Sequence, residues 1–576
     1  MSTAALKMPA KKPTKDSLRE LVETIVFVVV LVLVLKLFVV EAFVIPTGSM
    51  AETLLGYHKQ VHCEQCGFEF PVNASEEVEG RKDTGKVPVV GYHCPNCDFP
   101  GKLNLVEHSA GGGGKYYTTG LDWTSGDRVL VHKAMPIDHR GSVVVFKFPA
   151  DPQVDHVAQN YIKRLVGFGR ETIAVHNGDL FIHKSLEYPA TAYPRPEDPK
   201  DLWERRYTYM NAPVAKEAFE QAQKAGFPEN VGGFELLRKP DDQVLAMRRI
   251  VYHNDFQPQD LLKLGVPPRW KTSGEGWGAP EPGQKSFSHT GTGRGFLKYE
   301  HLRVGIKALR DGTTGVMSRV RALASEPGDD KSNEHAPIPT RITNFLGYNS
   351  GVRGAFVSQG EGPENIDNNN NWVGDLMVEC RTNLANNDAT VILDLARGPS
   401  RFQAHFSNGT VKLVRTGVGG KELASRPTPL TKAGTYDLRF ANVDCRLRVW
   451  VDGKAIDFGR EADYPFETPT TFESDDAVRK EGWTTANDVK EPAAIEVQGD
   501  ATISSLVLWR DTYYTHAENK DAEVDTFHVQ PGHFLCFGDN SAQSHDGRGW
   551  GQVPERLMLG RAVFIFWPRA RIGFIR

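Results

Sequence analysis

The stretch Phe43-Val-Ile-Pro-Thr-Gly-Ser-Met50 decides how the rest of this chain is organised. It follows an apolar segment directly, and it places Ser49 in an extended Pro-Thr-Gly-Ser turn. A serine in such a turn has a backbone N–H beside its hydroxyl, which suits a nucleophile that forms its own oxyanion site. Turn chemistry also favours these residue types in an ordinary loop. The stretch alone therefore leaves both interpretations open.

Three later segments favour the nucleophile. They are Gly126-Asp-Arg-Val-Leu-Val131, Tyr161-Ile-Lys-Arg164 and Gly538-Asp-Asn540, and the last of them runs on to Ser544, Asp546 and Arg548. In this order the four segments resemble the sequence boxes of the type I signal peptidases, which are membrane-bound serine–lysine endopeptidases that remove leader sequences. The resemblance covers roughly residues 42–60, 120–185 and 525–576. It depends on the order and context of the boxes rather than on any single box.

The resemblance implies a role for individual residues. Ser49 would be the nucleophile, and Lys163 would be the general base that takes its proton. Thr47 would donate its hydroxyl to the oxyanion, and Ser544 would orient the lysine through a hydrogen bond. The pocket for the leader peptide, which prefers small residues such as alanine, would be lined by Phe43, Ile45, Met50, Leu54, Tyr161 and Ile162.

The chemistry of Lys163 supports this assignment. Lys163 alternates with apolar neighbours on a predicted strand, so we expect its side chain to point inward. Loss of hydration disfavours the charged amine and lowers its pKa toward the range of a general base. Serine–lysine pairs are a known variant of the catalytic triad and need no histidine. A triad built on His545 and Asp546 is the competing arrangement, but adjacent residues in an extended segment point in opposite directions.

Some positions depart from the family pattern or carry no chemistry. Asp546 and Arg548 match a structural ion pair, but the second serine of that box is Gly547 here. Phe168-Gly-Arg-Glu171 stands where the family has a Pro-Gly-Asp turn, and Thr47 replaces a more usual serine. The Gly-Asp box at residues 126–131 predicts a turn that feeds a buried strand.

An apolar run precedes the nucleophile. Leu21 to Val40 would reach about 30 Å as a helix, which is enough to cross a bilayer. Basic residues lie before it, so the positive-inside rule predicts a cytoplasmic tail over residues 1–20 and a transmembrane helix over 21–41. The implied location is the bacterial cytoplasmic (inner) membrane, with a single pass and an extracytoplasmic catalytic domain. A cleaved signal peptide is the alternative.

Residues 61–119 form an insert marked by four cysteines in two CxxC pairs, Cys63 and Cys66, and Cys94 and Cys97. This spacing can wrap a tetrahedral metal and resembles a zinc ribbon. Four thiolates would leave no open coordination position, so the zinc would be structural, and catalysis needs no cofactor. His62 and His93 each precede a cysteine and could act as substitute or outer groups. Two disulfides or a redox CxxC remain alternatives.

The predicted fold is mainly β. The catalytic core comprises residues 42–60, 120–185 and 521–576, with a mixed insert over 186–269 that contains helices at Pro213–Lys224 and Asp241–Ile250. Residues 270–520 show short strands with turn signals, including a hairpin at Asn408-Gly409. They predict a β-sandwich insert that resembles the concanavalin/laminin-G jelly-roll group. Cys380 and Cys445 lie on predicted strands and could pair or remain free thiols.

Composition excludes some classes of function. At 576 residues the chain should form two to four domains, and its net charge of −4 gives no reason to expect a nucleic-acid partner. The expected substrates are signal peptides of exported preproteins, bound by β-strand addition beside membrane lipid. The rival function is a membrane-anchored protein with a vestigial peptidase core, whose jelly roll binds carbohydrate or protein. The presence of both Ser49 and Lys163 argues against this rival.

Overall fold

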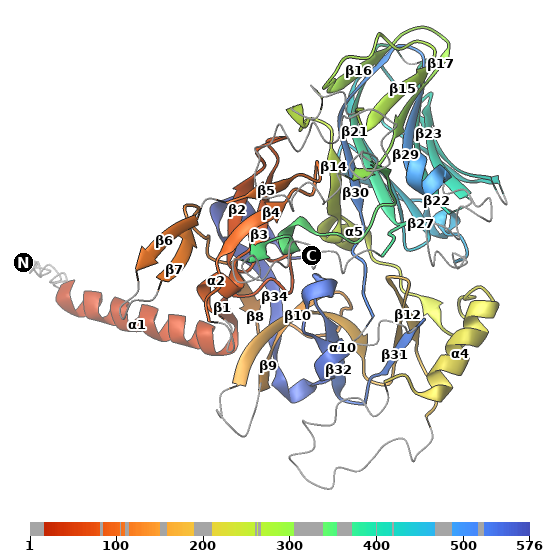
Figure 1. Ribbon diagram of the computed structural model, residues 1–576. Coiled ribbons are helices and arrows are strands. Elements are labelled where there is room, and N and C mark those ends of the chain that lie inside the picture. The colour runs from red at the N-terminus through yellow and green to blue at the C-terminus, as the bar shows by residue number, and fades with distance from the viewer. Residues whose placement is uncertain are drawn as a thin grey trace, which may run out of the picture.

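The structure, a computed structural model, is mainly β, as the sequence predicts. It describes the chain except for residues 1–16, 81–84, 104, 110–114, 150–157, 189–209, 260–261, 263–266, 304–337, 354–370, 387, 399, 418–419, 467–485 and 517–522. Most of the predicted cytoplasmic tail lies outside the described residues. So do a run of four glycines at 111–114, which the sequence suggests is a link, and most of a run of four asparagines at 368–371, which it suggests is a loop. Figure 1 shows a lower region that contains the core sheet and an upper region formed by the predicted β-sandwich insert, called the large insert below.

The first described element is helix α1 (Ser17–Phe38), which projects from the core in Figure 1 and exposes its apolar side chains. Among the described residues, no helix combines the length and the apolar character needed to cross a membrane. The predicted transmembrane helix over 21–41 is therefore not supported. The chain leaves the helix at Phe38 for strand β1, and the helix carries four charged residues, Arg19, Glu20, Glu23 and Lys36.

Strands from all three parts of the predicted core form one antiparallel sheet. Its order is β1 (Val40–Val44), β8 (Arg128–His132), β34 (Met558–Trp567), β9 (Val143–Pro149), β10 (Ala158–Phe168), β32 (His533–Phe537) and β33 (Val553–Pro554), with β35 (Gly573–Phe574) beside β34. Inward-facing side chains of these strands, such as Val129 and Val145, share an apolar cluster with the residues around Ser49. The chain therefore leaves this core before the large insert and returns to it afterwards, since β10 and β32 are neighbours in the sheet.

A second sheet extends this region. It contains β13 (Glu235–Leu236), β12 (Asp179–His183), β11 (Thr172–His176) and β31 (Asp525–His528), in that order. Helix α4 (Pro213–Lys224) covers it through Phe219, which packs edge-on against Phe181 of β12. The helix has the bounds that the sequence predicts. A proline at its first position has the fixed φ angle of a helix start, and Gly226 follows its end.

The large insert is a sandwich of two seven-stranded sheets around one buried apolar cluster. The first contains β14 (Arg249–His253), β30 (Ala501–Arg510), β21 (Leu376–Leu384), β26 (Gly434–Val443), β27 (Arg446–Val451) and β28 (Lys454–Ile456), with β16 (Ser286–His289) also on β30. The second contains β15 (Trp270–Gly274), β17 (Arg294–Tyr299), β29 (Ala493–Gln498), β22 (Thr390–Arg397), β23 (Ser400–Ser407), β24 (Thr410–Gly417) and β25 (Lys421–Pro427). A jelly-roll relationship remains a prediction.

Two local predictions in the insert have different outcomes. The Asn408-Gly409 hairpin is confirmed, since Ser407 pairs with Thr410 and both turn residues have the positive φ angles that this turn requires. The helix predicted over Asp241–Ile250 is shorter than expected. Helix α5 spans Asp241–Met247, because β14 begins at Arg249 and pairs with β30. Cys380 and Cys445 are both buried free thiols.

Short elements complete the fold around the cysteine-rich insert. They are β2 (His58–His62) paired with β3 (Glu69–Asn73), helix α2 (Ser75–Val78), β6 (Leu105–Ser109) paired with β7 (Lys115–Thr119), and a sheet of β20 (Val352–Arg353), β4 (Val89–His93) and β5 (Pro100–Lys102). Strand β18 (Leu302–Arg303) pairs with β19 (Ile338–Pro339). Because β20 comes from the large insert and β4 from the cysteine-rich insert, one sheet joins the two inserts.

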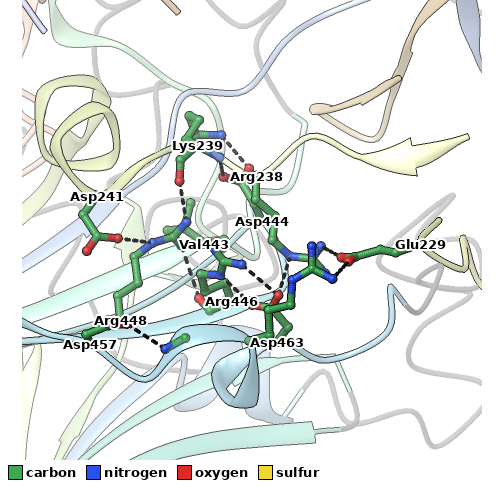
Figure 2. A network of polar contacts seen from close by, with 12 residues as sticks. Glu229, Arg238, Lys239, Asp241, Val443, Asp444, Arg446, Arg448, Asp457 and Asp463 are labelled. Atoms are coloured by element: carbon green, nitrogen blue, oxygen red, sulfur yellow. Dashed lines mark hydrogen bonds and ion pairs between the residues drawn. The ribbon is translucent and has the colours of Figure 1, made fainter. Parts of the chain in front are cut away.

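A network of charged residues joins the sandwich to the segment before it (Figure 2). Lys239 donates to Asp444 at 2.5 Å and lies 2.8 Å from Asp511, and Arg448 of β27 donates to Asp241 at 2.9 Å. Further along, Arg446 and Arg238 share Asp463, and Arg238 also pairs with Glu229. Removing one partner of a buried pair leaves an uncompensated charge. The network therefore joins the sandwich to residues 229–241, the segment before it.

Candidate active site

The Ser49 hydroxyl and the Lys163 amine contact each other directly. Ser49 lies in the turn after β1, and Lys163 lies in β10 opposite Val144 of β9. The Lys163 Nζ donates to Ser49 Oγ at 2.6 Å and to the Ile162 carbonyl oxygen at 3.1 Å. Lys163 is 3% exposed, whereas Ser49 is half-buried. Two residues 114 positions apart, which the sequence predicts as a pair, are thus within hydrogen-bonding distance.

Burial determines the charge of Lys163. Loss of hydration lowers the pKa of Lys163 from 10.5 to about 8, and the carboxylate of Asp546 acts in the opposite direction. The Nζ atom also lies 5.6 Å from the centre of the Tyr161 ring, which stacks on Phe146. A neutral amine beside a serine hydroxyl can accept its proton. The arrangement therefore has the chemistry of an activated serine nucleophile.

The Gly-Asp box at residues 126–131 clamps both ends of the Ser49 turn. The backbone N–H of Ile45 donates to the Asp127 carbonyl oxygen, and the Asp127 backbone N–H donates to the Leu55 carbonyl oxygen, both at 2.9 Å. The Asp127 carboxylate accepts the Leu55 N–H at 2.9 Å and pairs with Arg571. A Cβ atom on Gly126 would lie 1.7 Å from the Ile45 carbonyl oxygen, so only glycine permits this approach. The box therefore holds the turn in place, and the strand with buried valines that follows it, β8, is the one that the sequence predicts.

The fourth box holds the backbone of the turn from the other side. The Asn540 backbone N–H donates to the Ser49 carbonyl oxygen, and its side-chain Nδ2 donates to the Gly48 carbonyl oxygen, both at 3.0 Å. A Cβ atom on Gly538 would lie 2.4 Å from the Ser49 carbonyl oxygen. The sequence names Asn540 only as part of the fourth box and predicts no role for it. Its place directly after the Gly-Asp pair was the signal that could have indicated this role.

Two buried ion pairs shape the fourth box. Asp546 and Arg548 pair at 2.7 Å, as the sequence predicts, and Asp546 also accepts the Gly538 N–H at 2.8 Å. Asp539 accepts two hydrogen bonds from Arg164, at 2.7 and 2.6 Å. The Arg164 guanidinium holds the pKa of Asp539 below its usual range despite burial, and Arg548 does the same for Asp546. Both carboxylates therefore stay charged beside Lys163.

Ser544 does not make the contact predicted for it. Within the described part of the chain, the Ser544 Oγ atom is buried without a hydrogen-bond partner, so the predicted hydrogen bond to Lys163 is absent. Thr47, two residues before Ser49, and His545 are both exposed. The oxyanion and orienting roles of Thr47 and Ser544 stay predictions.

The predicted pocket residues fall into two groups. Ile45, Met50 and Leu54 are 2%, 0% and 0% exposed, and they lie with Ile162 in the apolar cluster beneath the Ser49 turn. Phe43 and Tyr161 are partly exposed. The buried residues therefore support the Ser49 turn, whereas Phe43 and Tyr161 are partly accessible, and the peptide pocket stays a prediction.

The four cysteines of the first insert converge on one point. Their sulfur atoms all lie within 4.8 Å of one another, with 3.6 Å between Cys66 and Cys94 and 3.7 Å between Cys63 and Cys97. All four are buried free thiols. A disulfide would require about 2.05 Å. His62 and His93 do not join the cluster, because they pair with Glu69 and Asp98.

Comparison with known sequences adds family information to this geometry. A family model described as "Signal peptidase, peptidase S26" matches residues 121–229 and 446–567, which include Lys163 and the fourth box. Signal peptidase I of Leptolyngbya laminosa is 50% identical over 40 residues, or 7% of this chain and 20% of that protein. Parts of this chain are therefore similar to signal peptidases. Mitochondrial inner membrane protease subunit 1 of Homo sapiens is 41% identical over 49 residues, or 8% of this chain and 30% of that protein.

The matches to these two relatives are local. The chain spans less than a third of the length of the curated relatives it matches. Among solved structures, the similarity to a carbohydrate binding module, CBM66 from Bacillus subtilis, covers 42% of this chain and 94% of that module, at 10% identity and a TM-score of 0.21. The similarity to sheep galectin-11 covers 23% of this chain and 90% of the galectin, at 17% identity and a TM-score of 0.16. Likenesses at these scores carry no argument about a ligand.

Proposed function

We propose that this protein is a signal peptidase that removes N-terminal signal peptides from exported preproteins, with Ser49 as nucleophile and Lys163 as general base. The observation that carries the proposal is the 2.6 Å contact between the Ser49 hydroxyl and a lysine amine that is buried and has a lowered pKa. The family matches support the same class of reaction. No metal or cofactor is required for this chemistry.

The proposed reaction has two steps. Neutral Lys163 takes the proton of Ser49 as Oγ attacks the scissile carbonyl carbon, and the resulting ammonium protonates the leaving amine as the peptide bond breaks. Water, activated by the regenerated amine, then hydrolyses the acyl-enzyme. The Ser49 backbone N–H and the Thr47 hydroxyl are the donors for the oxyanion. Asn540 keeps the Ser49 backbone in place during both steps through its hydrogen bonds to Gly48 and Ser49.

The leader peptide binds as an added strand next to β1. Among the described strands, β1 pairs only with β8 and forms one edge of the core sheet, so its other edge is available to an extended peptide. Phe43 and Tyr161 contact the residues before the cut. Preference for small side chains follows from the family resemblance, and the relatives indicate a membrane-associated protein.

Incubation of the purified protein with a synthetic preprotein tests the proposal. We expect one cut after the leader, identified by mass and by the new N-terminus. Ser49→Ala and Lys163→Ala should each abolish cleavage without unfolding the protein, and the double variant should be no worse than either single variant. His545→Ala should retain activity. A binding protein with a vestigial core would leave the preprotein intact, and near wild-type turnover in either single variant would exclude the dyad.

A further inference from the structure

The two cysteine pairs form turns of the same design. In the first, the Gly67 N–H donates to the Cys63 carbonyl oxygen, and Gly67 has a φ angle of 73°. In the second, the Asp98 N–H donates to the Cys94 carbonyl oxygen at 3.0 Å, and Asp98 has a φ angle of 61°. Each turn thus presents two sulfurs to a common centre. Four sulfurs at the roughly 2.3 Å zinc–sulfur distance would be about 3.8 Å apart in a tetrahedron, close to the 3.6 and 3.7 Å observed.

A segment of the large insert, which we call the arm (Leu346 to Ser350), lies against the second cysteine turn. The Ser350 Oγ accepts the His93 N–H at 3.1 Å, and it lies 3.0 Å from the His93 carbonyl oxygen and 2.6 Å from the Gly347 carbonyl oxygen. A Cβ atom on Gly347 would lie 2.8 Å from the Pro95 ring, so the arm backbone packs directly on the turn. Strand β20 follows the arm and pairs with β4, the strand that leads into this turn.

The same arm reaches the nucleophile. The side-chain amides of Asn349 and Asn540 exchange two hydrogen bonds, each 2.7 Å long. Asn540 in turn holds the carbonyl oxygens of Gly48 and Ser49. The Tyr348 side chain is fully buried and packs against Gly48. A Cβ atom on Gly48 would lie 2.2 Å from the Tyr348 ring, so the ring contacts the Gly48 backbone directly. An unbroken set of contacts therefore runs from the cysteine cluster to the Ser49 backbone.

We propose that the four cysteines bind one zinc ion and that this metal, through the arm, fixes the backbone of Gly48 and Ser49. Tyr348 and Asn349 are positioning residues in this scheme. The metal takes no part in the reaction, because four thiolates complete its coordination. Its removal frees the second cysteine turn, and with it the arm and the amide pair that holds Asn540. The large insert therefore contributes directly to the geometry of the nucleophile. The effect on cleavage rests on the proposed function, whereas metal binding does not.

Metal analysis and hydrogen exchange on the full chain test the proposal. We expect one zinc per chain in the wild type and in the control Cys380→Ser, which changes a buried thiol outside the cluster. Cys63→Ser and Cys94→Ser should hold less than about a tenth of an equivalent. Removing zinc with a chelator should increase amide exchange at least about tenfold in peptides covering residues 45–56 and 346–353. Exchange in β22–β24 of the sandwich should not change.

Asn349→Ala separates the arm from the metal. This variant should keep its zinc and its sandwich protection, and it should show faster exchange over residues 45–56 and a kcat lowered about tenfold at unchanged KM. Mass shifts showing two disulfides and no zinc would overturn the metal site. Bound zinc whose removal leaves exchange at residues 45–56 unchanged would overturn the coupling. If the wild type cut no preprotein, the metal and exchange measurements would still decide this inference, and only the proposed function would fall.

Discussion

The pH dependence of cleavage is the sharpest test of Lys163 as the base. With a pKa of about 8, about one molecule in eleven carries neutral Lys163 at pH 7, against about one in three thousand for a solvated lysine of pKa 10.5. Burial thus raises the reactive fraction at pH 7 by about 300-fold. We expect log kcat/KM for a synthetic preprotein to rise with a slope near one below pH 8 and to level off above it.

A charge variant identifies the group responsible for this profile. Asp546 raises the pKa of Lys163, so Asp546→Asn should move the inflection to lower pH, whatever it does to the maximal rate. A purely structural effect would lower the rate at every pH and leave the inflection in place. A wild-type rate that rises only above pH 10 would show that Lys163 has the pKa of a solvated lysine and is not the base. An inflection between pH 6 and 7 that disappears in His545→Ala would also exclude Lys163, because a histidine would then be the base.

The remaining predictions concern stability. Because the pKa of Lys163 is lowered by about 2.5 units in the folded state, its protonation penalises folding fully below pH 8, and the penalty fades between pH 8 and 10.5. Lys163→Met should therefore raise the free energy of unfolding at pH 7, measured by urea denaturation, by about 1–3 kcal/mol. It should also abolish cleavage. A variant less stable than the wild type would contradict the penalty assigned to protonation of the buried amine. Gly126→Ala, whose Cβ would meet the Ile45 carbonyl oxygen at 1.7 Å, should lower the free energy of unfolding by about 3 kcal/mol or more. The control Gly120→Ala, with nothing within 4 Å, should change it by less than about 0.5 kcal/mol, and equal effects would exclude the clamp.

Local patterns predicted much of this structure. The bounds of α4, Pro213 to Lys224, were predictable because a proline starts it and a glycine follows it. The Asn408-Gly409 hairpin was predictable because few other residue pairs adopt its φ angles. The end of α5 was not predictable from local sequence, because pairing of β14 with β30 converts Arg249 to strand. The apolar run after Leu21 predicted a transmembrane helix that the structure does not support.

The sequence predicted the Ser49–Lys163 contact and the Asp546–Arg548 ion pair, because their chemistry and order resemble one family, and it predicted the group of four cysteines, because their spacing suits one metal. It also predicted a hydrogen bond between Ser544 and Lys163, which is absent. The contacts that hold these residues in place could be read only from the folded structure. Asn540, Tyr348 and Asn349 carry no chemistry of their own, and the last two come from an insert with no resemblance to the peptidase boxes. These residues matter because they contact the Ser49 turn from positions about 300 to 500 residues further along the chain. Contacts between residues so far apart in the sequence leave no periodicity or spacing that a sequence pattern could reveal.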